Sequence, residues 1–164
     1  MKNVESKTYR MYGLVPYNIS PIQQGIQYGH AVVEYLNKYF NEPDCTKWRL
    51  NDKTFIILNG GTTNKSFSDF GTLNKYQQTL DFAGVRTASF YEPDLGNQLT
   101  AVVFLVDERV YDKTLWPDYN GMYHLNGTPI ETDYYSWKMK FAETEEEANQ
   151  VVVLRDFVKQ FRLA

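Results

Sequence analysis

The chain has 164 residues, of which 43% are hydrophobic and 23% charged, a composition that fits one globular domain and excludes a disordered or collagen-like chain. Its 17 basic and 20 acidic residues give a net charge of −3, which argues against broad, sequence-independent binding to nucleic-acid backbones. With one cysteine and two histidines, no internal disulfide can form, and neither a thiolate- or imidazole-rich metal site nor another cofactor is expected.

The first predicted elements are a strand and a long helix. Residues 8–15 favour a strand that Pro16 ends, because Tyr, Met and Val are common in strands. The Ser-Pro-Ile-Gln sequence at 20–23 supplies a helix N-cap, a first-turn proline and a capping box. Apolar residues at spacings of three and four then predict a helix over about residues 20–40 with one apolar stripe. The stripe comprises Ile22, Ile26, Gly29, Val33, Leu36 and Phe40.

Further elements alternate between strand and helix. The short apolar run at 54–58 is typical of a strand covered on both faces, and a helix is predicted over 72–83. Strands follow at 85–91 and 100–106. Long helical crossovers imply parallel pairing, whereas the short connection at 92–99 favours an antiparallel pair. The sequence therefore predicts an α/β fold, a four-stranded mixed sheet with helices on both faces.

The last third of the chain is predicted to be an extension of this domain. Asn-Gly pairs at 120–121 and 126–127 indicate turns around a small hairpin. A second capping box precedes a helix at about 145–161, whose apolar stripe we expect to pack on the domain. The expected division is an α/β domain over 1–108 and a C-terminal extension over 109–164 that ends in this helix.

A polar stripe on the first helix is one candidate for a functional surface. Gln23, Gln27, His30 and Glu34 follow one another at spacings of four, three and four, so they share one face. Such a face can line a cleft beside the sheet. An ordinary solvated helix face with a hydrogen-bonded histidine explains the same spacing.

The segment after the third strand is the second candidate. Asp94, Asn97, Gln98 and Thr100 are concentrated there, between two buried strands. Loops at strand ends often carry binding and catalytic groups, and a carboxylate can accept a proton or orient water. A turn held by the Asp94 and Asn97 side chains is the alternative interpretation.

Together these segments resemble the type 2 peptidyl-tRNA hydrolase family. Residues 27–31, Gln-Tyr-Gly-His-Ala, are similar to the family's Gln-x-x-His-Ala on the first helix. Residues 94–98, Asp-Leu-Gly-Asn-Gln, resemble its Asp-Ala-Gly-x-Thr-Gln segment, and Thr100 stands where the family has a threonine entering its last strand. The resemblance covers about residues 8–108. The remainder looks like an extension of phage-encoded relatives.

This resemblance implies an esterase that cleaves the bond between a peptide and the 3′ ribose of tRNA without a metal. Asp94 would be its acidic catalytic residue, with Gln98 and Thr100 as polar partners. The expected substrate-binding residues are Gln23, Gln27, His30 and Asn97. The partners implied are the 3′ end of tRNA and a second copy of the chain in a homodimer.

The expected location is the cytoplasm, that of the host if the protein is viral. The first residues form no apolar signal segment, and no apolar run reaches the roughly 20 residues that span a bilayer, so no membrane contact is expected.

A second function is left open by one departure from the family pattern. Gln23 occupies the position at which the family usually has a lysine, and glutamine offers only a neutral hydrogen bond to an oxyanion or phosphate. The alternative is a catalytically inactive module that binds a nucleotide, RNA or a host protein. Tyr134, Tyr135 and Trp137 could stack a base or anchor a partner, or else pack the C-terminal helix.

Overall fold

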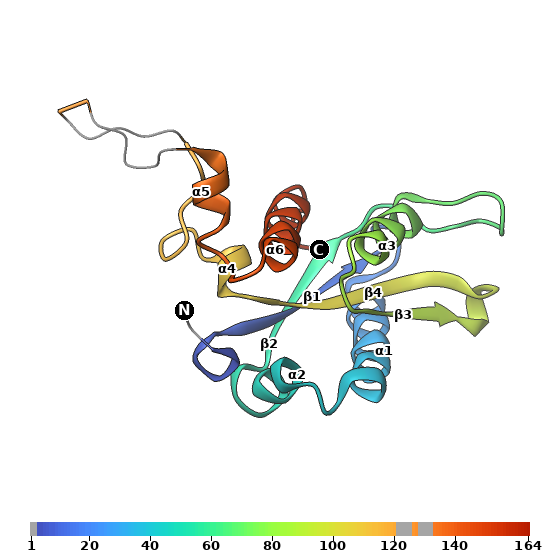
Figure 1. The fold of residues 1–164 in the computed structure, drawn as a ribbon. Coiled ribbons are helices and arrows are strands. Elements are labelled where there is room, and N and C mark those ends of the chain that lie inside the picture. The colour runs from blue at the N-terminus through green and yellow to red at the C-terminus, as the bar shows by residue number, and fades with distance from the viewer. Residues whose placement is uncertain (1–2, 121–125, 128–132) are drawn as a thin grey trace.

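The fold is a four-stranded mixed sheet with helices packed on it (Figure 1). This computed structural model describes residues 3–120, 126–127 and 133–164. The spatial order of the strands is β2-β1-β4-β3, with β1 parallel to β2 and β4 antiparallel to both β1 and β3. The predicted α/β class and the predicted antiparallel pair are both confirmed. The strands are β1 (Tyr9–Val15), β2 (Thr54–Asn59), β3 (Thr87–Glu92) and β4 (Gln98–Asp107).

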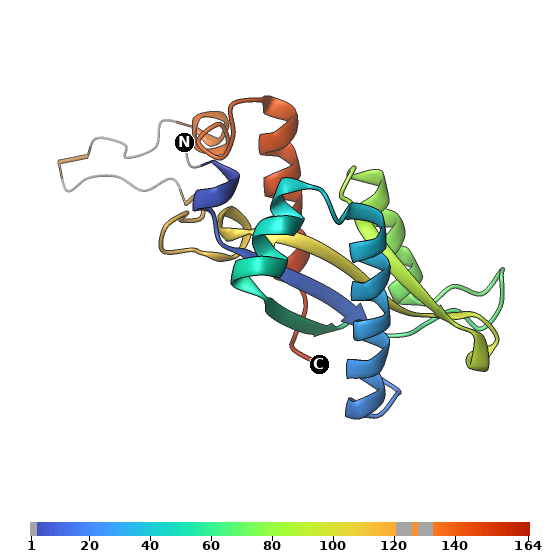
Figure 2. The same ribbon diagram turned by 90° about the horizontal axis from the view of Figure 1, so that it is seen from below.

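Helices cover both faces of the sheet, as Figure 2 shows from the side of α1. On one face lie α1 (Pro21–Tyr39) and α2 (Pro43–Lys47), and on the other α3 (Thr72–Phe82) and α6 (Glu145–Val158). Each face has its own apolar core, so the sheet is the layer between two cores. Shorter elements are η1 (Val4–Ser6), η2 (Trp48–Asp52), η3 (Pro93–Leu95), α4 (Glu108–Tyr111) and α5 (Tyr134–Lys138).

Helix α1 begins where the sequence predicts but buries a different face. The Ser20 hydroxyl accepts a hydrogen bond from the Gln23 backbone N–H at 3.2 Å, which caps the helix. The apolar stripe is largely exposed: Ile22 by 76% and Val33 by 56%. The helix instead buries large tyrosines, whose rings supply apolar area while their hydroxyls can find partners. The buried residues are Gln27, Tyr28, Ala31, Val32 and Tyr35.

A glycine in β1 lets α1 approach the sheet closely. The Tyr28 ring lies 2.3 Å from the position that a Cβ atom on Gly13 would take, so no larger residue fits there without a shift. The Tyr28 hydroxyl donates to the Met11 carbonyl at 2.8 Å. Gly25 and Gly29 of α1, which could have permitted such an approach, have no atom within 4 Å of their Cβ positions.

The apolar strand β2 is an edge strand, and both of its faces are partly covered: Ile56 and Leu58 pack in the core on one face of the sheet and Ile57 in the core on the other. Phe55 is 58% exposed. The outer edge is paired with residues 162–164, where the Asn59 N–H donates to the Arg162 carbonyl and the Ala164 N–H to the Ile57 carbonyl, both at 2.9 Å. This pairing occupies backbone groups that an open edge would present.

The C-terminal helix packs on the sheet as predicted. Its N-cap is Thr144, and its inner face joins the core that contains Phe104 of β4. The guanidinium of Arg155 is buried and donates to the Arg109 carbonyl and to Asp118, each at 2.6 Å. Trp137 packs against Phe141 in this region. The hairpin predicted near residues 120–127 lies mostly outside the described residues.

Candidate functional site

A bulge in the sheet presents Thr100 to α1. In the antiparallel pair of β3 and β4, Leu99 lies opposite Tyr91 and Ala101 opposite Phe90, so Thr100 has no partner in the register. Its side chain is buried on the α1 side. Bulges re-aim single side chains and are common beside active sites.

A chain of hydrogen bonds runs from this threonine to the end of β3. The Thr100 hydroxyl donates to Gln27 Oε1 at 2.6 Å, and Gln27 Nε2 donates to Glu92 Oε2 at 2.8 Å. Gln27 is only 3% exposed, and both ends of its amide are used. The amide therefore has one orientation, and that orientation holds the Glu92 carboxylate.

Glu92 in turn positions Asp94. Glu92 Oε1 accepts the backbone N–H of Asp94 at 3.2 Å, which caps η3. The hydrogen bond from Gln27 and that from the Asp94 N–H lower the pKa of Glu92, and nearby His30 adds to the effect. Glu92 is therefore an ionised acceptor at neutral pH rather than a proton donor.

The Asp94 carboxylate is free. It is exposed on η3, and no side chain or backbone group among the described residues bonds to it. The turn in which Asp94 caps its own loop is thus not formed, because Glu92 makes the cap. A free carboxylate beside a cavity is the arrangement that a general base needs.

Asp94 borders an open cavity of about 460 Å³ between α1 and η3. The lining carries two carboxylates and two glutamine amides, and none of its described residues is cationic. It can therefore take up a proton and offer neutral hydrogen bonds, but it attracts no anion by charge. We call this space the η3 cavity; it is lined by Ile19, Ser20, Gln23, Gln27, Glu92, Asp94 and Leu95.

The sequence-predicted residues do not all meet at the η3 cavity. Asp94, Gln23 and Gln27 line the η3 cavity, and Thr100 reaches it only through Gln27. The exposed His30 stacks on Phe90, with ring centroids 4.4 Å apart. Gln98 is opposite Glu92 in the strand register but does not line the cavity.

Asn97 borders a separate groove, which shares no lining residue with the η3 cavity. It has a left-handed backbone, with φ of 59°, and borders a space of about 520 Å³. Exposed aromatic rings and side-chain amides share this space, which we call the aromatic groove. It is lined by Asn64, Phe67, Phe70, Asn74, Gln77, Gln78, Tyr91 and Asn97.

Glu92 is the site residue that the sequence did not point to. It precedes Pro93, and a residue before proline is extended and well suited to be an N-cap, which is the signal that could have found it. The bulge at Thr100 has no such local signal, because it depends on the partner strand.

The sequence matches no protein-family model and no curated protein.

Two further features concern the described residues alone. No helix within 3–120 or 133–164 has both the length and the apolar character needed to cross a bilayer. In the same ranges, three or more histidine, cysteine, aspartate or glutamate side chains are nowhere grouped so as to hold a metal ion.

Proposed function

We propose that the chain is an ester hydrolase of the peptidyl-tRNA hydrolase type, acting in the η3 cavity on the ester between a peptide and the tRNA 3′ ribose. The observation that carries the proposal is the free, exposed Asp94 carboxylate, held at the cavity rim through Glu92 and the buried Gln27 amide. Such positioning lowers the entropic cost of placing a base beside its substrate.

In this mechanism Asp94 takes a proton from a water molecule as the water oxygen attacks the ester carbonyl carbon. The tetrahedral intermediate collapses by breaking the bond between that carbon and the ribose oxygen. Asp94 then returns the proton to the ribose oxygen, which balances the reaction. Gln23 lies on the rim and supplies a neutral donor to the intermediate, weaker than a lysine would be.

Thr100 and Gln27 act as positioning residues. Thr100 is buried and touches Gln27 rather than the cavity, so it reaches the reaction only through Glu92 and Asp94. The role of Gln98 as a polar catalytic partner of Asp94 remains a prediction, as does that of His30 in substrate binding.

The aromatic groove supports a nucleic-acid end as the leaving group. Phe67 is fully exposed and Tyr91 is 47% exposed, and unpaired bases stack on rings of this kind. The exposed Asn97 and Gln78 place amides beside the rings, where they can bond to a base edge. Tyr91 and Asn97 of the groove stand close to η3 in the chain, and Asp94 and Leu95 of η3 line the cavity, so one RNA end could occupy both.

The charge of the η3 cavity favours a second candidate function. Glu92 and Asp94 contribute two negative charges, and the described lining supplies no cation to hold a phosphate. A catalytically inactive module that binds a nucleotide, RNA or a host protein through the aromatic groove needs no phosphate contact in the cavity.

The test is release of tRNA from an N-blocked aminoacyl-tRNA at low salt. We expect turnover by the parent and a loss of about 10²- to 10⁴-fold in Asp94→Asn, the usual contribution of a general base. Asp156→Asn on the exposed side of α6 is the matched control and should keep full activity. Equal turnover by Asp94→Asn contradicts the role of Asp94.

Binding of the tRNA end without turnover would support the second candidate. We expect Phe67→Ala to weaken that binding under either function, because stacking on an aromatic ring contributes about 1–3 kcal/mol per base. If the folded parent shows neither turnover nor binding of the tRNA end, both the esterase and the RNA-binding function are contradicted.

A further inference from the structure

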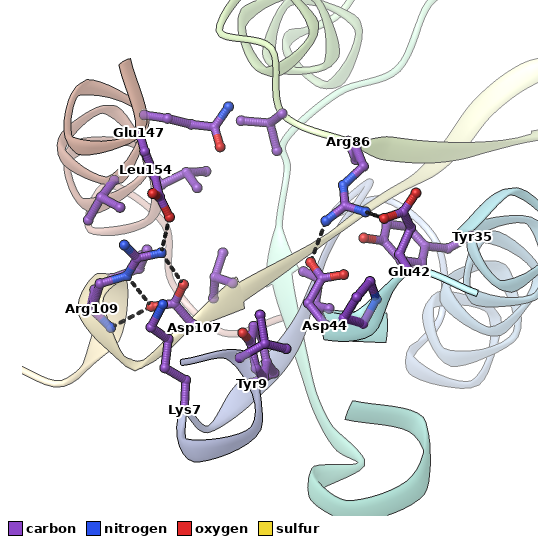
Figure 3. Close-up of a pocket in the computed structure, with 18 residues that line it drawn as sticks. Lys7, Tyr9, Tyr35, Glu42, Asp44, Arg86, Asp107, Arg109, Glu147 and Leu154 are labelled. Carbon is purple, nitrogen blue, oxygen red and sulfur yellow. Dashed lines mark hydrogen bonds and ion pairs between the residues drawn. The ribbon is translucent and has the colours of Figure 1, made fainter. Parts of the chain in front are cut away.

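A second cavity lies at the opposite end of the sheet from the η3 cavity. It has a volume of about 270 Å³ and lies where the start of β1 and the end of β4 meet α6 and the segment before α2 (Figure 3). We call it the polar pocket. It shares no lining residue with the η3 cavity, so a ligand in the polar pocket is independent of the proposed function.

Two clusters of ion pairs form facing walls of the polar pocket. On one wall Arg86 bonds to Asp44 and lies 3.2 Å from Glu42. On the other wall Arg109 lies 2.8 Å from Asp107 and 3.1 Å from Glu147 (Figure 3). Each guanidinium is shared by two carboxylates, so both walls are fixed and polar.

Three buried side chains in the polar pocket have no partner for their polar tips. Lys7 is 8% exposed, Tyr9 4% and Tyr35 1%. Within the described part of the chain nothing bonds to the Lys7 ammonium or to either hydroxyl, although all three residues line the pocket (Figure 3). The tips themselves are not closed off, because the fully buried side-chain nitrogen and oxygen atoms that lack a partner among the described residues are the Nε atoms of Arg49 and Arg155. Three tips that open into one cavity and bond to no described group can therefore take up the hydrogen bonds of a ligand.

The charges of the lining define the chemistry of that occupant. Three cationic side chains face four carboxylates, so a multiply charged anion such as phosphate is repelled. A simple cation would leave the Lys7 ammonium without a counter-ion. The volume is below that of pockets for drug-sized ligands, which excludes a chain segment or a nucleotide.

We infer that the polar pocket binds a small zwitterion, of which a free α-amino acid is the simplest. Its carboxylate would accept from the Lys7 ammonium and the Tyr9 hydroxyl. Its ammonium would face the wall of Asp44 and Glu42, within reach of the Tyr35 hydroxyl. This arrangement gives each of the three unpaired groups a partner and adds no net charge.

The test is a titration of the full chain with each of the standard free amino acids, followed in ¹H–¹⁵N spectra. We expect saturable shifts at Lys7, Tyr9 and Tyr35 with at least one of them. Lys7→Met and Tyr35→Phe should each weaken that binding by about tenfold or more, because a hydrogen bond to a charged group is lost. The matched controls Lys75→Met and Tyr17→Phe, both on exposed residues, should bind as the parent does.

Two chemical probes separate the zwitterion from simpler ligands. The methyl ester of the bound amino acid lacks the anionic carboxylate and its deaminated acid lacks the ammonium, so both should bind more weakly. Stronger binding of inorganic phosphate, or no shift with any amino acid, overturns the inference.

The stability of Tyr35→Phe tests the premise directly. A hydroxyl without a partner contributes nothing to the folded chain, so the variant should unfold at the same denaturant concentration as the parent or a higher one. A marked loss of stability would mean that the hydroxyl has an internal partner, and the inference would fail.

Discussion

The two ends of the sheet differ in which of their polar groups are bonded and which are left without a partner. In the η3 cavity the buried polar groups are fully bonded, and one exposed carboxylate, Asp94, is left free. In the polar pocket the carboxylates are paired, and the buried groups Lys7 and Tyr35 are left free. A free carboxylate at the rim of a cavity suits chemistry on a large external substrate, whereas several unbonded groups around one smaller cavity suit a small ligand.

Helix α1 joins these two regions. Gln27 and Tyr35 lie on the same buried face, two helical turns and about 12 Å apart. The first anchors the hydrogen-bonded chain of the η3 cavity and the second lines the polar pocket. Substitutions in the two regions should therefore have different effects. Those that break the ion pairs of the polar pocket should lower stability, and those at Asp94 in the η3 cavity should lower activity.

The largest effect on stability is expected at Arg109 in the polar pocket. Arg109→Met leaves Asp107 and Glu147 without their shared cation, and removing one member of a buried ion pair costs about 3–5 kcal/mol. Urea unfolding measures this loss. Lys159→Met, which removes an exposed pair, should stay within about 0.5 kcal/mol of the parent, and Asp94→Asn should do the same. A small loss of stability for Arg109→Met would contradict the view that the ion pairs of the polar pocket stabilise the fold.

An intermediate effect is expected at Gln27. Gln27→Met leaves the Thr100 hydroxyl without its main acceptor and Glu92 without a donor, which should cost about 1–3 kcal/mol and also lower turnover. Gln160→Met on the exposed C-terminal segment is the control. In a double-mutant cycle, Thr100→Val should cost less in the Gln27→Met background than in the parent. Additive costs would mean that the two side chains are not coupled.

Two adjacent valines on α1 give a smaller contrast. Val32 is 8% exposed and Val33 is 56% exposed. Val32→Ala should lower the free energy of unfolding by about 1–2 kcal/mol, and Val33→Ala should leave it unchanged or raise it slightly, since alanine favours helix. Thermal unfolding of both variants decides which face of α1 is the inner one. Equal losses of stability would mean that Val33 is buried as well, as the apolar stripe predicted from the sequence requires.

The smallest expected effect is a shift of the pKa of Glu92 at the η3 cavity. The pKa of Glu92 is lowered from its ordinary value of 4.5 by its hydrogen bonds. Its contribution to stability is therefore present above that value and lost as the pH falls through the lower folded pKa. A ¹³C titration should show the pKa of Glu92 rising toward 4.5 in Gln27→Met. An unchanged pKa would remove Gln27 as the cause.

The order and type of the main elements could be predicted from the sequence, but not all of the faces they bury. Helix caps and strand composition are local signals, and α1, α3 and the four strands appear where those signals lie. The inner face of α1 was missed because Tyr28 and Tyr35 bury their rings while the aliphatic Ile22 stays outside. The position of β2 at the edge of the sheet, with Phe55 exposed, depends on the sheet order, which composition does not encode.

The candidate site could be predicted in part. Gln27 and Asp94 belong to recognisable segments, and the structure brings both to one cavity. Glu92 and the bulge at Thr100 arise from the pairing of β3 with β4, which is a non-local property. The polar pocket is lined by residues from six separate parts of the chain, so no single stretch of sequence predicts it.

The bulge at Thr100 also shifts, by one residue, the alternation of β4 side chains between the two faces of the sheet. Before it Leu99 belongs to the core beneath α3 and α6, and after it Ala101 belongs to the core beneath α1, with one unpaired residue between them. Deleting that residue would shift one half of the strand by one position and turn its side chains to the opposite layer. Chimeras and deletion libraries that cut through β4 must therefore preserve its length as strictly as its composition.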